Sequence, residues 1–395
     1  MLIRRTAPFW VGLLVLMLCA CGSSTVPDVG GTGGTSGGTS GGTTGSTTGG
    51  STDGGTSGGV GGGPDVGSTT YNPCNTGDFP WQGGYAALAT SFSSVQLDPS
   101  TPDYNQAVVP ASFDGTLLRP SDTQTYPGKR PVVIIEHGEA GDQCNMWWLA
   151  HALSGAGYVT LLVQQPKISP ASTEGTSIVA MVSALQFIES PDNPYSYYID
   201  TSRIGLSGHS EGATSAAYVQ GLPLASSVRA IVAFDNLKHY VQGDTGSALI
   251  ECIAPKKYPV TPTVPALGFA QDMSCVAKLA ANGPDIKESG WSWWLQSAQP
   301  SIELVMKGFS HLTFTDTIVV GGNSQQLQTL ATYTQAWFDR WIQGDTSADQ
   351  TLLSCTVVNQ NTVDVLSTKY LSGAYLPSQG TQTSDFRTLL QQTCP

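Results

Sequence analysis

Residues 203–213 read Arg-Ile-Gly-Leu-Ser-Gly-His-Ser-Glu-Gly-Ala, and this segment is the strongest indication of the fold in the chain. A β-prone run leads into a Gly-His-Ser-Glu-Gly sequence, and small residues with a helical pattern follow it. The arrangement predicts a nucleophile elbow, in which Ser210 sits on a tight turn between a strand and a helix with its hydroxyl exposed. Gly208 and Gly212 leave room for the adjoining strand and helix, and glycine tolerates the backbone angles of such a turn.

The five-residue pattern alone is weak evidence, because it occurs four times in this chain. It also matches around Ser36, Ser40 and Ser57, which lie in a tract of glycine, serine and threonine. None of these three serines has a strand pattern before it or a helix pattern after it. Only Ser210 has the context that the motif requires.

Apolar runs alternate with helical patterns on both sides of the elbow. We expect strands at 130–136, 158–163, 204–207, 228–234, 266–269 and 302–306, and helices at 147–156, 172–189, 211–219 and 327–342. Such alternation predicts an α/β fold with a mostly parallel sheet and helices on both faces. Residues 85–118 contain alternating residues and no long helix pattern, so we expect an antiparallel lead-in.

A serine hydroxyl needs a neighbouring base, and that base needs an orienting acid. In this architecture the chain order is serine, acid, histidine. Of five histidines only His311 lies beyond the last expected strand, so it is the predicted base. Asp272 is our preferred acid and Asp235 the alternative, while Asp285 lies further along a loop; each also has the ordinary reading of a cap or turn aspartate.

The transition state also needs hydrogen-bond donors for its developing oxyanion. The backbone N–H of Glu211, next to the nucleophile, is one predicted donor. The loop after strand 130–136 reads His137-Gly138-Glu139, and it predicts the backbone N–H of Glu139 as the second. A simple turn at the end of the strand is the alternative explanation.

The first 70 residues are expected to export the protein and tether it. Arg4 and Arg5 precede an apolar stretch of ten residues, which is too short to span a bilayer. Residues 1–20 are therefore predicted to be a signal peptide, and Leu-Cys-Ala-Cys at 18–21 resembles a lipoprotein signal that lipidates Cys21. An ordinary secretory signal is the alternative. Residues 21–70 form a tether too poor in apolar residues to fold, and 71–395 form one domain.

The net charge and the cysteine content further restrict which partners and bound metals are expected. The chain has 29 acidic and 17 basic residues, a net charge of −12, which disfavours nucleic-acid partners. Six cysteines remain in the exported domain, and we expect pairing by proximity as Cys74–Cys144, Cys252–Cys275 and Cys355–Cys394. None of these cysteines is spaced like a metal-binding pair, so no metal site is predicted.

These motifs resemble the cutinase and polyester-hydrolase branch of the α/β-hydrolases, which is related to the dienelactone hydrolases and includes enzymes that degrade poly(ethylene terephthalate). The resemblance extends from about residue 85 to the C-terminus. It rests on His-Gly at 137–138 with Trp-Trp at 147–148, Gly-His-Ser-x-Gly at 208–212, Val-Pro-Ala-Leu at 264–267, Gly-x-Ser-His at 308–311, and Ser-Asp-Phe-Arg-Thr at 384–388 with the terminal Cys-Pro. It implies the α/β-hydrolase fold and a lidless, monomeric serine esterase that uses an acyl-enzyme and no cofactor.

The resemblance also implies substrate-contacting positions at His209 and near Leu237. Where the family carries an aromatic residue and a methionine at the mouth, this chain has Glu139 and Glu211. The cleft should therefore be more anionic, and polymeric and small polar esters both stay open as substrates. An amidase or peptidase, or a surface binding protein with a degenerate site, are the competing functions. The expected location is the outer membrane or cell surface, through a lipid anchor, or the medium.

Overall fold

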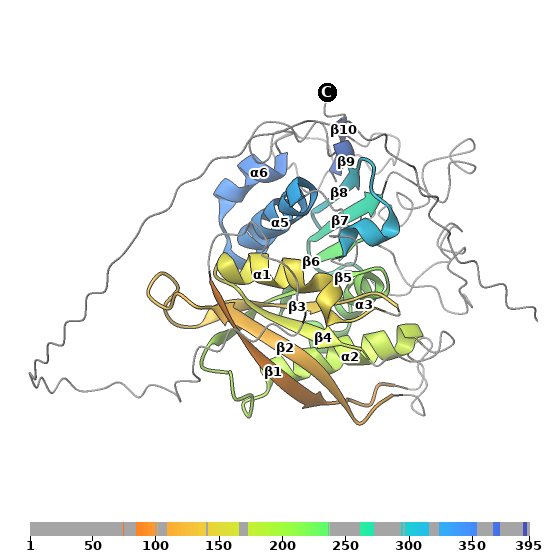
Figure 1. Cartoon of the computed structure of the whole chain (residues 1–395). Coiled ribbons are helices and arrows are strands. Elements are labelled where there is room, and N and C mark those ends of the chain that lie inside the picture. The colour runs from red at the N-terminus through yellow and green to blue at the C-terminus, as the bar shows by residue number, and fades with distance from the viewer. Residues whose placement is uncertain are drawn as a thin grey trace, which may run out of the picture. The chain divides into compact units, whose positions relative to one another are not determined.

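A ten-stranded sheet organises the part of the chain that the computed structural model describes. The described residues are 74, 84–98, 101, 109–139, 141–165, 173–235, 237, 261–271, 294, 297–315, 324–353, 366–371 and 390–392. The strand order is β1-β2-β4-β3-β5-β6-β7-β8-β9-β10 (Figure 1). The strands are β1 (Tyr85–Ser93), β2 (Ser112–Pro120), β3 (Arg130–Glu136), β4 (Val159–Gln164), β5 (Ile199–His209), β6 (Val228–Phe234), β7 (Ala266–Gln271), β8 (Ser301–Met306), β9 (Leu366–Leu371) and β10 (Leu390–Gln392).

The central six strands, β4-β3-β5-β6-β7-β8, are parallel to one another. The outer pairs are antiparallel: β1 and β2 at one edge, and β9 and β10 at the other. The predicted α/β class, the mostly parallel sheet and the antiparallel lead-in are thus confirmed. Parallel strands covered on both faces read as nearly continuous apolar runs, as residues 131–135 of β3 do.

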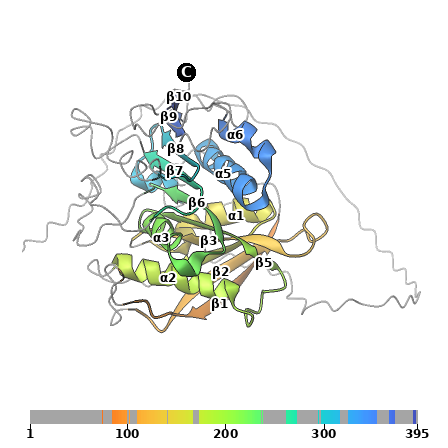
Figure 2. The same ribbon diagram turned by 180° about the vertical axis from the view of Figure 1, so that it is seen from behind.

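Helices cover both faces of the sheet, and alternate residues of each central strand feed two separate cores. In β3, Val132 and Ile134 face the core that contains α2 (Thr173–Glu189) and α3 (Glu211–Val219). Val133 and Ile135 face the other core, with α1 (Trp147–Gly155) and α5 (Ser324–Phe338). Figure 2, the view from behind, brings α2 and α3 to the front. This two-sided burial follows from the period of two in strand side chains.

The same alternation holds in β6. Ile231 and Ala233 belong to the core under α2 and α3, while Val232 and Phe234 belong to the core under α1 and α5. The carboxyl ends of parallel strands meet at one edge of a sheet, and in open α/β folds ligand-binding and active sites lie at this edge. Glu136, His209, Phe234 and Met306 end β3, β5, β6 and β8 at that edge.

Some boundaries differ from the expected ones. Strand β5 begins at Ile199, five residues earlier than expected. Residues 200–203 are polar and at least partly exposed, so this part of the strand lacks the apolar run from which a buried strand is predicted. The helix expected at 327–342 begins at Ser324 and changes into a π-helical turn, η8 (Asp339–Gln343), that ends at the left-handed Gly344. Strands β9 and β10 were not expected. Their sequences, Leu-Ser-Thr-Lys-Tyr-Leu and Leu-Gln-Gln, lack the apolar run of a central strand.

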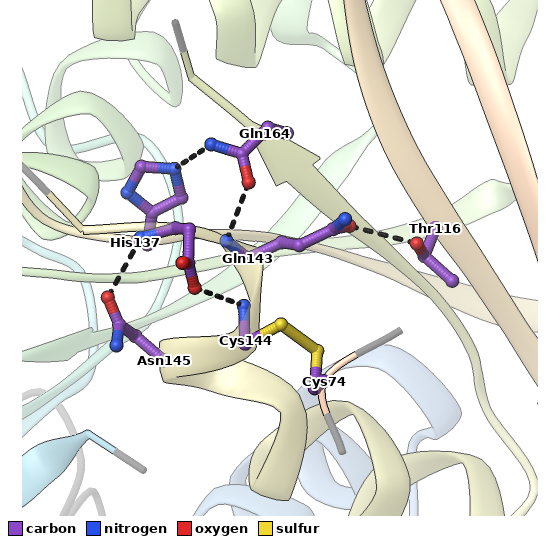
Figure 3. The surroundings of a disulfide bond; sticks show 8 residues. Cys74, Thr116, His137, Gln143, Cys144, Asn145 and Gln164 are labelled. Atoms are coloured by element: carbon purple, nitrogen blue, oxygen red, sulfur yellow. Dashed lines mark hydrogen bonds between the residues drawn. A yellow bond between two sulfur atoms is a disulfide. The ribbon is translucent and has the colours of Figure 1, made fainter. Parts of the chain in front are cut away.

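One predicted disulfide lies within the described residues. Cys74 is bonded to Cys144, which belongs to the short 3₁₀ helix η2 (Gln143–Met146). The Asp142 carboxylate accepts a hydrogen bond from the Cys144 backbone N–H and so caps this helix. Figure 3 shows the disulfide beside this helix. The pairing Cys74–Cys144 is confirmed, whereas Cys252, Cys275, Cys355 and Cys394 lie outside the described residues.

Candidate active site

Ser210 occupies the turn between β5 and α3, as the motif predicts. Its backbone adopts φ 53° and ψ −111°, and it is one of two described non-glycine residues with positive φ. This conformation is strained for any residue other than glycine, and such backbone strain is typical of turns at functional sites. The Ser210 N–H donates to the Phe234 carbonyl at 2.9 Å, so the end of the neighbouring strand β6 holds the strained residue.

The two glycines of the elbow are required by space. A Cβ on Gly208 would lie 2.3 Å from the Gly212 carbonyl carbon. A Cβ on Gly212 would lie 2.5 Å from the Glu136 carbonyl oxygen, at the end of the adjacent strand β3. Both contacts are with backbone atoms, which cannot move aside without displacing a strand or a helix. The prediction that Gly208 and Gly212 leave room for the adjoining strand and helix is therefore confirmed.

The imidazole of His311 pairs with Asp235. His311 begins the short helix η6 (His311–Phe314) after β8, and Asp235 directly follows β6. The distance from His311 Nδ1 to Asp235 Oδ2 is 2.6 Å, with the carboxylate fully buried and the imidazole 28% exposed. The acid that the structure places against the histidine is thus the alternative from the sequence, Asp235. The preferred residue, Asp272, lies outside the described residues.

Gln271, the last residue of β7, fixes the Asp235 carboxylate. Its backbone N–H donates to Asp235 Oδ1 at 3.2 Å, and its Nε2 donates to Oδ2 at 3.0 Å. Together with His311 Nδ1–H, these donors stabilise the ionised carboxylate in a buried place. Because Nδ1 is hydrogen-bonded to Asp235, Nε2 is the ring nitrogen through which His311 could exchange a proton with another group.

His209 connects the elbow to the histidine loop. Its Nε2 lies 2.8 Å from the His311 backbone carbonyl, and the two rings lie with centroids 4.6 Å apart. His209 is only 3% exposed, and Leu237 is fully buried in the core beside β7. The two residues expected to touch substrate are therefore both placed in packing positions. Through its hydrogen bond to the His311 carbonyl, the His209 side chain also links the end of β5 to the loop that carries His311.

The predicted oxyanion loop lies against Ser210. A Cβ on Gly138 would lie 3.0 Å from the Ser210 Cβ, so any larger residue would crowd Ser210 and His209. Glu139 follows with an exposed side chain, and Glu211 begins α3 with a buried one. Gly138 of the predicted oxyanion loop thus lies close to Ser210, and Glu211 directly follows Ser210 in the chain.

A buried carboxyl group lies beneath the elbow. Glu136, at the end of β3, is fully buried, and this burial raises the pKa of its carboxyl well above the usual range, with the Glu211 charge adding to the rise. Gln165 Nε2 donates to Glu136 Oε1 at 2.8 Å and lies 2.9 Å from the Ser177 hydroxyl. Ser177 in turn bonds the Ser215 hydroxyl of α3 at 2.6 Å. Glu136 thus belongs to a polar cluster that joins β3, α2 and α3, and its burial favours the protonated form of the carboxyl group.

Gln271, Gln165 and the side chain of His137 contribute to the site but were not predicted from the sequence. Gln271 closes the run Ala-Leu-Gly-Phe-Ala-Gln, in which it is the only polar side chain. A single polar residue at the carboxyl end of a buried parallel strand is a signal that could have identified it. Gln165 follows β4 in the same way, directly after a buried run.

Three further observations bear on ligands and membranes. Cys21, the predicted lipidation site, lies outside the described residues. Among the residues that the structure describes, no group of three or more His, Cys, Asp or Glu side chains is arranged to hold a metal ion. Within the same residues, no helix has both the length and the apolar character needed to cross a bilayer.

No protein-family model matches the chain, and no curated protein matches its sequence. The site is therefore described by its own geometry, a strained Ser210 and the hydrogen-bonded pair of His311 and Asp235.

Proposed function

We propose that this protein is a serine hydrolase of carboxylic esters with an α/β-hydrolase fold. The observation that carries the proposal is the pairing of His311 Nδ1 with the buried Asp235 carboxylate at 2.6 Å, at the sheet edge that bears the strained Ser210. The chain order serine 210, acid 235, histidine 311 is the order of that fold. The mostly parallel sheet, with the elbow at the end of β5, supports the same assignment.

Each residue has a defined task in the proposed reaction. Ser210 Oγ bonds to the ester carbonyl carbon, its proton passes to His311 Nε2, and the carbonyl electron pair moves onto oxygen. The backbone N–H groups of Glu139 and Glu211 stabilise that oxyanion. When the intermediate collapses, the alcohol leaves with the proton from His311. Asp235 stabilises the imidazolium that exists between these two transfers.

Deacylation repeats the sequence with water. His311 takes a proton from water, the resulting hydroxide bonds to the acyl carbon, and Ser210 leaves with that proton as the carboxylic acid is released. The steps use only side chains and backbone groups of this chain. The proposal therefore needs no cofactor.

The substrate is proposed to be an acyl ester, polymeric or soluble. The exposed Glu139 side chain stands at the predicted oxyanion loop, and the chain has an excess of 12 negative charges. Both features disfavour anionic substrates, because like charges repel at the mouth of a site. We also propose that the protein is a monomeric lipoprotein of the outer membrane or cell surface, attached through Cys21.

A panel of esters tests the reaction class. The full-length protein and its Ser210→Ala variant are assayed on p-nitrophenyl esters from acetate to palmitate, on a polyester film and on matching anilides. Hydrolysis of esters by the wild type, with loss of about 10⁴-fold or more in the variant, is the expected result. Faster cleavage of anilides would favour an amidase or peptidase. No Ser210-dependent turnover of any substrate would favour a binding protein.

A further inference from the structure

The loop that follows β3 is held by the imidazole of His137. His137 is buried, and its Nδ1 lies 2.8 Å from the Gly138 carbonyl oxygen. The same carbonyl accepts a hydrogen bond from the Gly141 N–H at 3.1 Å. Both lone pairs of the Gly138 oxygen are thus committed, and this fixes the plane of the peptide unit that joins Gly138 to Glu139.

The tautomer of His137 follows from its other nitrogen. The backbone N–H of Gln165 points at His137 Nε2, at 3.1 Å. A backbone amide only donates, so Nε2 must accept and carries no proton. The ring is then neutral with its proton on Nδ1, and that N–H donates to the Gly138 carbonyl.

A second contact holds the ring from the side of the disulfide. The Gln164 side-chain amide lies between two elements: its Nε2 is 3.3 Å from His137 Nε2, and its Oε1 accepts from the Gln143 backbone N–H at 3.0 Å. Figure 3 shows this bridge from His137 through Gln164 to η2 and the Cys74–Cys144 bond. The imidazole is therefore attached to β4 and η2 as well as to its own loop.

The held peptide determines where the Glu139 N–H points. In a trans peptide unit the carbonyl and the following N–H point in opposite directions. Because His137 and Gly141 hold the Gly138 oxygen on one side, the Glu139 N–H is directed to the other side. Gly138 itself touches Ser210, since a Cβ there would lie 3.0 Å from the Ser210 Cβ.

On the basis of the proposed hydrolase function, we infer that His137 is a positioning residue for the oxyanion. Its Nδ1–H holds the peptide between Gly138 and Glu139 in the orientation in which the Glu139 N–H donates to the developing negative charge. Its effect on the rate passes through the backbone.

Two conservative variants separate the two hydrogen bonds of the ring. In His137→Asn the amide nitrogen replaces Nδ1 and can still donate to Gly138. In His137→Gln the amide reaches the place of Nε2, so it keeps a partner for Gln165 and loses the bond to Gly138. His151→Asn is the matched control, because His151 lies on α1 and packs its ring against Tyr85, away from the site.

The kinetic result expected on a short p-nitrophenyl ester is a loss in kcat with KM nearly unchanged. The asparagine variant should lose less than about 10-fold and the glutamine variant about 10- to 100-fold, because a misdirected donor forfeits part of the two to three orders of magnitude that one oxyanion donor supplies. Inhibition by an aryl trifluoromethyl ketone, whose Ser210 adduct carries the oxyanion, should weaken by the same factor as kcat/KM. The His151 control should match the wild type.

Three results would overturn the inference while leaving the hydrolase proposal standing. They are a glutamine variant at least as active as the asparagine variant, a loss confined to KM, and unchanged inhibition by the ketone. The tautomer is tested without any activity by ¹⁵N spectra of histidine-labelled protein. The resonance pair that disappears in the His137 variants should report a protonated Nδ1, and a protonated Nε2 would refute the account. If the wild type neither hydrolyses esters nor binds the ketone, the proposed function itself is wrong.

Discussion

At the scale of single residues, the site depends on groups that hold other groups. Gln271 holds Asp235, Asp235 holds His311, and His209 braces the His311 backbone. The sequence could identify Ser210 and His311, because a motif and the chain order mark them. It could not choose the acid. Asp235 and Asp272 follow neighbouring parallel strands at the same edge, and the choice depends on the local backbone, which at Asp235 has φ 44°.

Replacing Asp235 by Asn should reduce kcat by about 10⁴-fold, because an amide donor opposite Nδ1 stabilises the wrong imidazole tautomer. The measurement is steady-state hydrolysis of p-nitrophenyl acetate by the folded variant. Asp272→Asn is the comparison, and it should retain far more activity. A severe loss from Asp272→Asn with a mild one from Asp235→Asn would reverse the assignment.

Replacing Glu136 by Gln should flatten the pH dependence of stability. At a pH below its ordinary pKa, Glu136 is protonated in both the folded and the unfolded state. Its carboxyl group then makes no pH-dependent contribution to the free energy of unfolding. As the pH rises, the unfolded carboxyl ionises while the buried one keeps its proton, because its pKa is raised. The free energy of unfolding therefore falls with pH in the wild type, and the amide removes this contribution.

The measurement is urea unfolding of both proteins between about pH 5 and 8. The advantage of the glutamine variant over the wild type should grow with pH. The exposed Glu139→Gln is the control and should keep the wild-type slope. Parallel curves for Glu136→Gln and the wild type would show that this carboxyl is ionised in the folded protein.

At the scale of elements, the strand-to-helix turn at the elbow requires two close backbone contacts. The central strands and α1–α3 could be predicted because buried parallel strands and their crossover helices have distinct periods. Strands β9 and β10 could not, because their pairing depends on β8 rather than on a pattern of their own. The π-helical end of α5 likewise reflects packing, since η8 lies against β5 and β6.

Replacing Gly212 by Ala should remove activity and destabilise the fold by more than about 2 kcal/mol, because the new Cβ would lie 2.5 Å from a strand carbonyl. Gly344→Ala is the matched control. Gly344 has φ 79° with open space around its Cβ position, so that change should cost only about 1–2 kcal/mol of strain. Its activity should stay at the wild-type level. Chemical denaturation and ester turnover measure both effects, and a fully active Gly212→Ala would contradict the close packing.

At the scale of the whole molecule, the disulfide between Cys74 and Cys144 joins the start of the described chain to the helix beside the oxyanion loop. Pairing by proximity along the chain was enough to predict this bond. The export signal, the tether and the lipidated cysteine rest on sequence patterns alone and stay predictions.

Replacing Cys74 by Ser should lower the free energy of unfolding by about 2–4 kcal/mol, since the bond closes a long loop in the unfolded chain. The two cysteines are 70 residues apart in sequence. Denaturant unfolding of the variant against the oxidised wild type gives the value. A stability equal to that of the wild type would mean that the N-terminal segment adds nothing to the fold.

The central claim is that Ser210 is a nucleophile activated by His311. The most direct test is to treat the full-length protein with a fluorophosphonate and to map the adduct by mass spectrometry of its peptides. We predict stoichiometric labelling of Ser210 in the wild type, and labelling slowed by at least about 10³-fold in His311→Asn, because the base is gone. Folded wild-type protein that is unlabelled at Ser210, or a His311 variant labelled at the wild-type rate, would contradict the account.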